Sequence, residues 1–323
     1  MKRKIAVIGV LLATLAAWGG TLSTAYAQAF PVRPVRIVVP GTGGSADSVA
    51  RLVAQGLSGR LGQQVIVDNR PNGIIPIELV IKAQPDGYTI LLYGSTVWLM
   101  PYLNSNITYD PIRDFAPISL AVSSPNIVVV PVSFPVKTIA ELIALAKSKP
   151  GALNYGTTGT GNATHLAAEL FKSMTGVNIV RINYKAAGTA LTDLIGGQIQ
   201  VMFAPAASVA PHLKAGKLHA LAVTSAKPSL LRPDLPTVAS AGLPGYESLA
   251  MSGIFAPEKT PANLIIRLSS EIAKVLHSAE VRQKLIDSAV EPVGSTPQEL
   301  TAVMKAEMAR LGKVIRDAGI RDE

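Results

Sequence analysis

Four short segments of small and polar residues each follow a β-branched or aromatic run in this 323-residue sequence. They are Pro40-Gly-Thr-Gly-Gly-Ser45, Gly94-Ser-Thr96, Gly156-Thr-Thr-Gly-Thr-Gly-Asn162 and Ala186-Ala-Gly-Thr189. A helix-like segment follows each of them, so each should present the free backbone N–H groups of a helix N-terminus. Most of the four also contain Ser or Thr hydroxyls. If the turns converge, they would bind a carboxylate without a formal cation. The alternative is that each is only a good turn with a helix cap.

Other chemistries lack their motifs. Segment 156–162 has no Lys-Ser/Thr of a P-loop, and no G-x-G-x-x-G follows the first strand-like run. Ser45 and Ser95 do not lie in a G-x-S-x-G elbow. The chain has no cysteine, and its histidines have no metal-ligand spacing: His165, His212, His219 and His277. We therefore predict no enzyme activity, no cofactor and no metal. A secreted α/β hydrolase built from distant residues is the alternative.

Three charged or titratable residues stand beside the polar turns, and each has two interpretations. Asp47 either favours the start of its helix or shapes the pocket. His165 lies in the first turn of a helix, where it either packs and caps or contacts a ligand. Lys185 either is a solvated loop residue or attracts an anion.

The hydrophobic spacing alternates between strand-like and helix-like segments. The predicted strands are 36–39, 64–68, 88–93, 115–121, 126–131, 153–155, 178–184, 199–203 and 218–223. The predicted helices are 49–61, 77–83, 138–146, 163–175, 190–196, 209–215, 261–277, 279–288 and 297–318. Thr138 with Glu141 and Thr296 with Glu299 are predicted capping boxes, and Thr260 is a predicted N-cap.

Strands that alternate with helices are typical of parallel sheets with helices on both faces. Ligands bind such α/β folds beyond the carboxyl ends of the strands. The four polar turns all stand at such ends, so we expect them to share one site.

The N-terminus has the pattern of a secretory signal peptide. Lys2, Arg3 and Lys4 precede a short apolar stretch, and Ala25-Tyr-Ala27 is an A-x-A site, which predicts cleavage after Ala27 and a periplasmic protein. An uncleaved membrane anchor is the alternative. The formal charge of +9 comes with scattered Lys and Arg and only 5% aromatic residues, which argues against nucleic-acid binding.

A series of short motifs runs through the chain in a specific order. They are Phe30-Pro-Val-Arg-Pro-Val-Arg-Ile-Val-Val-Pro40, Gly43-Gly-Ser-Ala-Asp47, Val67-Asp-Asn-Arg-Pro71, Pro85-Asp-Gly-Tyr-Thr89, Leu235-Pro-Thr237, Gly242-Leu-Pro-Gly-Tyr246 and Phe255-Ala-Pro257. In this order they resemble the periplasmic receptors of tripartite tricarboxylate transporters, also called Bug proteins.

The resemblance implies a type II periplasmic binding-protein fold, with two doubly wound α/β lobes joined by two crossover strands. Residues 1–27 would be the signal peptide, 28–125 plus 247–323 the first lobe, and 126–246 the second. A monomer would close on a small carboxylate and deliver it to the membrane subunits of a transporter. Presentation to a membrane sensor is the alternative.

The resemblance also implies the ligand-binding residues. The first lobe would contribute Gly43, Gly44, Ser45, Asp47, Gly94, Ser95 and Thr96. The second lobe would contribute Thr157, Thr158, Gly159, Thr160, Asn162, His165, Lys185, Ala206 and Ser208.

Three positions depart from the family pattern. Gly41 follows Pro40 where relatives usually have an aromatic residue, and the glycine-rich stretch at residues 72–76 is short. Ala204-Pro205 stands where many relatives have Asp-Asn. These differences concern the ligand rather than the fold.

Overall fold

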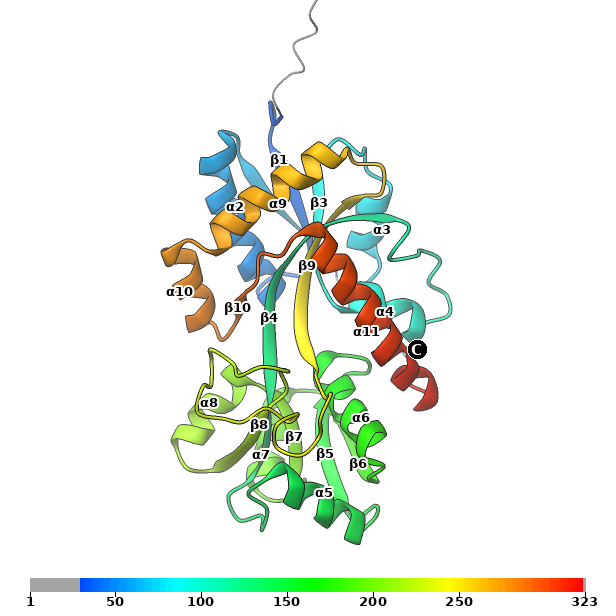
Figure 1. The fold of residues 1–323 in the computed structure, drawn as a ribbon, viewed down its shortest axis with the longest axis vertical. Coiled ribbons are helices and arrows are strands. Elements are labelled where there is room, and N and C mark those ends of the chain that lie inside the picture. The colour runs from blue at the N-terminus through cyan, green and yellow to red at the C-terminus, as the bar shows by residue number, and fades with distance from the viewer. Residues whose placement is uncertain (1–29, 72, 322–323) are drawn as a thin grey trace, which may run out of the picture. The chain divides into compact units, whose positions relative to one another are not determined.

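The computed structural model describes residues 30–71 and 73–321. The described residues from Arg33 onward form one compact unit, whose elements are drawn in Figure 1. The predicted signal peptide and its cleavage site at Ala27 lie outside the described residues. Within the described ranges, no helix combines the length and the apolar character needed to cross a membrane.

The first group of strands has β1 (Val35–Pro40) between two neighbours. Its neighbours β2 (Val65–Arg70) and β3 (Thr89–Gly94) run parallel to it, as predicted. The sheet then continues with antiparallel strands: β9 (Leu249–Pro257) pairs with β3, and β4 (Phe115–Pro131) pairs with β9. The short β10 (Glu291–Pro292) also pairs with β4.

The second strand group contains the other half of β4. It pairs antiparallel with β7 (Val201–Pro205) and with β8 (Leu218–Val223). Next to β7 lies β5 (Leu153–Thr158), followed by β6 (Ile179–Tyr184), and these pairs are parallel. The two groups are therefore mixed sheets rather than purely parallel ones, with β4 common to both (Figure 1).

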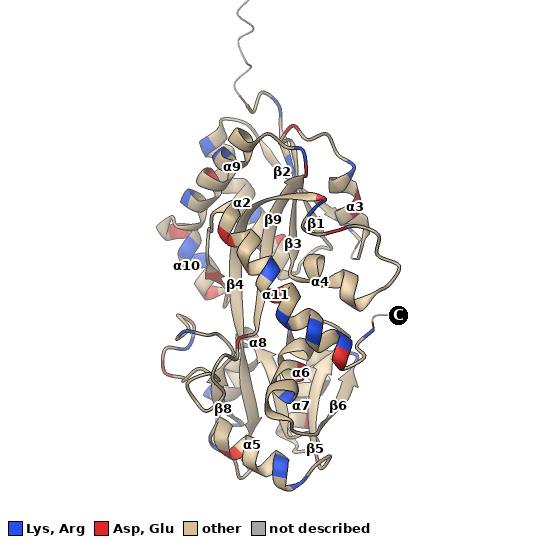
Figure 2. Cartoon of the chain, turned by 45° about the vertical axis from the view of Figure 1, so that its right-hand side comes forward, with Lys and Arg blue, Asp and Glu red and all other residues tan. Residues whose placement is uncertain are grey.

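Ten helices are described with these strands. With the first strand group are α2 (Ser45–Leu61), α3 (Ile75–Ile81), α4 (Thr96–Leu103), α9 (Ala262–Leu276), α10 (Ala279–Asp287) and α11 (Pro297–Asp317). With the second are α5 (Ile139–Ser148), α6 (Ala163–Thr175), α7 (Ala187–Ile195) and α8 (Ala206–Lys214). Figure 2 shows Lys and Arg spread over several of these helices and interspersed with acidic residues.

The most extended element, β4, corrects the sequence prediction. Two strands at 115–121 and 126–131 were expected, but β4 is continuous over 17 residues. Pro125 stands between the predicted strands, at the point where β4 changes neighbours. β4 pairs with β9 as far as Pro125 and with β7 from Asn126 onward. Pro125 is the last residue of the ladder with β9, so its missing N–H falls at the end of one ladder and before the start of the next.

Three elements are absent from the sequence prediction, namely α4, β9 and the two-residue β10. β9 mixes small residues with apolar ones, and α4 contains Pro101. Both are nevertheless buried in the core: Trp98 of α4 packs against Phe255 of β9 with ring centroids 6.2 Å apart. Tertiary packing therefore overrides weak local propensity in these two segments.

The helix caps agree with the sequence in part. Thr296 and Glu299 form the predicted capping box of α11. Thr138 accepts a hydrogen bond from the Glu141 N–H, but the Glu141 carboxylate accepts from the N–H of Lys137 instead of Thr138, so this box is incomplete. The N-cap prediction for Thr260 is wrong, since its hydroxyl donates to the Pro257 carbonyl and α9 begins at Ala262.

Candidate functional site

Two adjoining cavities lie where the loops after β1, β3, β5 and β7 meet β4 and β9. We call them the polar cavity, about 360 Å³, and the apolar cavity, about 280 Å³. Four residues line both: Ser124, Asn162, Ala163 and Ala250. The predicted convergence of polar turns is thus present, because Ser45 and Ser95 line one cavity and Thr158 lines its neighbour.

The polar cavity presents hydroxyl groups that the protein does not use. They make no hydrogen bond to any described residue, and they belong to Ser45, Ser95, Thr96, Ser123 and Ser252. An unpaired hydroxyl at the wall of a cavity is free to donate a hydrogen bond to a bound oxygen. The cavity therefore offers several uncharged hydrogen-bond donors.

Three helices begin at the wall of the polar cavity. They are α2 at Ser45, α4 at Thr96 and α6 at Ala163. The first N–H groups of a helix have no partner within the helix and carry a partial positive charge. Gly44, the N-cap of α2, contributes no side-chain cap, so the N-terminus of α2 is not closed off by its own N-cap residue.

The apolar cavity is lined by Leu191, Met202, Phe203, Pro205 and four alanines, together with seven Ser, Thr and Asn residues. Two further helix starts reach its wall, at Ala187 of α7 and in the first turn of α8 at Ser208.

Most polar side chains of the apolar cavity already have partners in the protein. The hydroxyls of Thr157 and Thr164 lie 3.0 Å apart, and the Asn162 Oδ1 caps α6 by accepting the His165 N–H at 2.9 Å. The hydroxyls of Thr158 and Ser208 make no hydrogen bond among the described residues.

Charge is absent from the walls of both cavities. Among the described residues, no Lys, Arg, His, Asp or Glu lines either one. An anion bound here would be stabilised by N–H groups, hydroxyls and helix dipoles rather than by an ion pair. Such a neutral site can bind and release an anion reversibly.

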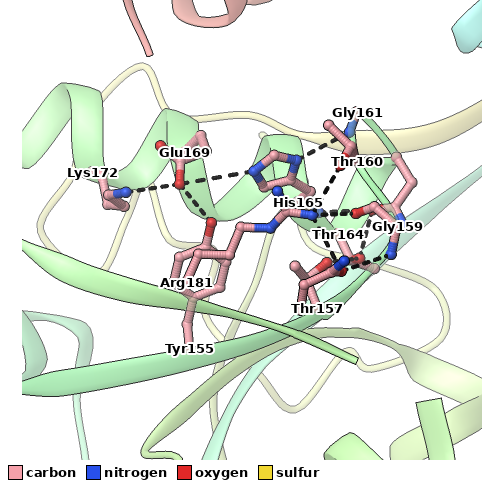
Figure 3. A network of polar contacts seen from close by, with 12 residues as sticks. Tyr155, Thr157, Gly159, Thr160, Gly161, Thr164, His165, Glu169, Lys172 and Arg181 are labelled. Atoms are coloured by element: carbon pink, nitrogen blue, oxygen red, sulfur yellow. Dashed lines mark hydrogen bonds and ion pairs between the residues drawn. The ribbon is translucent and has the colours of Figure 1, made fainter. Parts of the chain in front are cut away.

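A network behind the loop at residues 158–162 holds that loop in place (Figure 3). Arg181 Nη2 donates to the Gly159 carbonyl at 2.8 Å, and the Asn183 Oδ1 accepts the Gly159 N–H at 3.1 Å. On the far side of the loop, the Gly161 N–H donates to His165 Nδ1 at 3.0 Å. The loop is thereby anchored by residues that line neither cavity.

His165 belongs to this supporting network and lines neither cavity. Burial lowers its pKa to about 4, so the ring is neutral at physiological pH and its Nδ1 is an acceptor. Its Nε2 lies 3.9 Å from the Glu169 carboxylate, which accepts hydrogen bonds from the Tyr155 hydroxyl and from Lys172. The packing and capping interpretation of His165 fits these contacts.

Asp47 has a corresponding role in the turn between β1 and α2. Its carboxylate accepts the Gly43 N–H and the Asn69 side-chain N–H, both at 2.9 Å, and pairs with Arg51 at 2.9 Å. The hydrogen bond from Asn69 is the main cause that lowers its pKa. Asp47 therefore shapes the turn that places Ser45 at the polar cavity.

We expect Asp47→Ala to lower the free energy of unfolding by about 2 kcal/mol at pH 7, because the buried carboxylate and its hydrogen bonds to Gly43 and Asn69 are lost. The pKa of Asp47 is lowered in the folded protein, so this stabilisation is present above its ordinary pKa of 3.8 and disappears in acid. Urea denaturation of wild type and variant at pH 7 and pH 3 measures both effects. Asp317→Ala, which removes an exposed partner of Lys313, is the control and should have little effect.

The other predicted residues divide into two sets. Lining the cavities are Ser45, Gly94, Ser95, Thr96, Thr157, Thr158, Asn162 and Ser208. Lining neither are Gly43, Gly44, Asp47, Gly159, Thr160, His165, Lys185 and Ala206. In the second set, Lys185 is exposed on the loop after β6, and Ala206 is buried at the start of α8.

Several lining residues escaped the sequence prediction because they lie on crossover strands rather than in turns. They are Ser123, Ser124 and Asn126 of β4, and Ala250, Met251 and Ser252 of β9. The polar run at residues 123–126 between two apolar runs was the one signal available in the sequence.

A family model describing the receptors of tripartite tricarboxylate transporters matches residues 49–320. The chain belongs to this receptor family. The family is one of substrate-binding receptors, and its members are periplasmic binding proteins.

Three solved structures are similar to this receptor over most of its length. A protein from R. palustris solved with adipate is 38% identical, with 90% of this chain and 99% of that one covered and a TM-score of 0.72. The periplasmic binding protein BugD is 31% identical, with 91% and 100% covered and a TM-score of 0.70. MatC from Rhodopseudomonas palustris, solved with bound malate, is 29% identical, with 88% and 100% covered and a TM-score of 0.68.

These likenesses confirm the type II periplasmic binding-protein fold that the resemblance implied for this Bug receptor. In this fold the polar turns of the receptor stand at the carboxyl ends of β1, β3 and β5, where α/β folds bind ligands.

Proposed function

We propose that this receptor binds a small carboxylate in the adjoining polar and apolar cavities and delivers it to the membrane subunits of a tripartite tricarboxylate transporter. The observation that carries the proposal is the arrangement of the cavity walls. Five helices begin there, unpaired hydroxyls face inward, and none of the described lining residues is ionised. This combination favours an anion with strong oxygen acceptors.

The solved relatives support the chemical class of the ligand. One was solved with adipate and another with malate, and both compounds are small carboxylates. The cavities are of the size that suits such molecules, at about 280 and 360 Å³.

Binding would proceed by closure of two lobes, with boundaries near Pro125 and Tyr246. β4 and β9 both pass between the strand groups, so a small change in their backbone angles would rotate one group against the other. A ligand that touches both lobes has a higher affinity for the closed form and shifts the population toward it. The closed form would be the one that the membrane subunits recognise.

We expect calorimetry to detect binding of at least one acid from a panel of hexanoate, benzoate, adipate, malate and citrate. Ser95→Ala, in the polar cavity, and Thr158→Ala, in the apolar cavity, should each weaken that binding about ten-fold, the effect of one lost hydrogen bond to a charged group. Ser148→Ala removes an exposed hydroxyl of α5 and should leave the affinity unchanged. A folded protein that binds none of these acids would contradict the proposed function.

A further inference from the structure

The two adjoining cavities differ in the number of free donors that they offer. The polar cavity has five unpaired hydroxyls, those of Ser45, Ser95, Thr96, Ser123 and Ser252. The apolar cavity has two, those of Thr158 and Ser208, because its other polar side chains bond within the protein. A carboxylate that enters from water therefore recovers more hydrogen bonds in the polar cavity.

The walls of the apolar cavity favour hydrocarbon instead. Met202, Phe203 and Ala204 of β7 and Leu191 of α7 are buried and line this space. No cation among the described lining residues is present to balance a second negative charge. The starts of α7 and α8 also reach this wall, but with only two free hydroxyls a second carboxylate would recover fewer hydrogen bonds here than in the polar cavity, whereas an apolar group would gain from leaving water.

We propose that this receptor selects acids that carry one carboxylate on an uncharged, apolar body. The inference rests on the proposed function and refines it. The carboxylate occupies the polar cavity among the starts of α2, α4 and α6, and the body occupies the apolar cavity against Leu191, Met202 and Phe203. Aromatic and medium-chain aliphatic monocarboxylates belong to this class.

The size of the apolar cavity agrees with such a body. A dry protein cavity of about 150 Å³ lined by Leu, Ile and Phe binds benzene. The apolar cavity measures about 280 Å³, so it accepts a body of six or more carbon atoms. Compact polar acids would leave much of this space without contacts, which lowers their affinity.

The selection can be tested with two acids of equal length. Hexanoate and adipate both have six carbons, and they differ in whether the far end is a methyl or a carboxylate group. We expect hexanoate to bind at least ten-fold more tightly than adipate in calorimetry at pH 7.5, because only adipate places a second charge in the apolar cavity. Benzoate should also bind more tightly than adipate.

A charge-introducing variant makes the test specific to the apolar cavity. Ser208→Lys adds a cation at the far wall, on a half-buried position of α8. The variant should reverse the order of the two acids, so that adipate binds more tightly than hexanoate. Ser148→Lys on α5 adds the same charge away from the cavities and should leave the order unchanged.

The outcomes separate the inference from the proposed function. If adipate binds the wild-type protein as tightly as hexanoate or more tightly, the inference is overturned while carboxylate binding stands. If neither acid binds, and no other member of the panel does, the proposed function itself fails. A ten-fold preference for hexanoate that Ser208→Lys reverses supports both.

Discussion

Glu307→Gln is expected to gain stability relative to the wild type as the pH rises. The free energy of unfolding of the variant minus that of the wild type should be about 3 kcal/mol larger at pH 8 than at pH 4. Glu307 of α11 is buried, with 2% of its surface exposed. Burial raises its pKa from 4.5 to about 7, despite hydrogen bonds from Trp98 and Arg310 that act in the opposite direction. The folded protein therefore binds this proton more tightly than the unfolded chain does.

The sign of the pH effect follows from that difference in proton binding. Between pH 4.5 and pH 7 the unfolded chain releases the Glu307 proton while the folded protein retains it, so stability falls as the pH rises through this window. Glutamine carries no such proton, and the variant avoids the loss. Its amide oxygen can still accept the hydrogen bond from the Trp98 indole.

The surroundings of Glu307 form a third cavity, about 530 Å³, beside β4, β9 and α11. Four other charged groups line it: Lys227, Glu247, Glu291 and Arg310. Arg310 lies 3.4 Å from Glu307 and 3.5 Å from Glu247. These contacts do not offset the cost of burial, which is why the carboxyl remains partly protonated near neutral pH.

His165 must be considered in the same measurement, because it titrates in the opposite sense. Its pKa is lowered from 6.5 to about 4, so its contribution is complete above pH 6.5 and is lost as the pH falls toward 4. The two groups partly cancel in the wild type over the shared window. Comparing Glu307→Gln with the wild type at each pH by urea denaturation removes the His165 contribution. Glu78→Gln, at an exposed position of α3, is the control for the Glu-to-Gln substitution itself.

A constant difference between Glu307→Gln and the wild type from pH 4 to pH 8 would contradict this explanation. It would mean that the folded protein and the unfolded chain release the Glu307 proton at the same pH.

Gly161→Ala is expected to lower the free energy of unfolding by about 2 kcal/mol and to weaken carboxylate binding. Gly161 has a φ of +72°, a conformation that alanine adopts at a cost. A Cβ at this position would also lie 2.6 Å from Leu103 Cδ1, at the end of α4. Relief of that contact would move either Leu103 or the loop at residues 158–162, which lines the apolar cavity.

The matched control is Gly176→Ala at the end of α6. Gly176 has nearly the same φ, +69°, but a Cβ there meets nothing within 4 Å. The control therefore includes the backbone cost without the contact with Leu103. Urea denaturation should show a smaller loss for Gly176→Ala, and calorimetry should show unchanged ligand binding. Equal effects of the two substitutions on both measurements would exclude a special role for the contact.

Local elements with strong periodic or capping signals could be predicted from the amino-acid pattern alone. The helix at residues 163–175 has the predicted limits, and the end of α2 at Gly62 follows from a glycine with φ +68°. The Thr296 capping box is also present as predicted. These features depend on residues within a few positions of one another, so the sequence pattern contains the information needed.

The sequence also indicated that polar turns at strand ends would meet. Ser45, Ser95 and Thr158 do line adjoining cavities. This followed from a general property of α/β folds, in which the carboxyl ends of parallel strands lie at one edge of the sheet. The family resemblance, carried by many short motifs in order, implied the same arrangement.

Which polar residues line the cavities and which support the lining loops depends on long-range contacts in the folded chain. The Asp47 carboxylate accepts a hydrogen bond from Asn69, 22 positions away, and the Gly159 carbonyl accepts one from Arg181, also 22 positions away. Ser123 and Ser252 reach the polar cavity because β4 and β9 pair antiparallel across more than a hundred residues of sequence. Whether a hydroxyl or carboxylate is free depends on partners that are distant in sequence, and local spacing does not specify those partners.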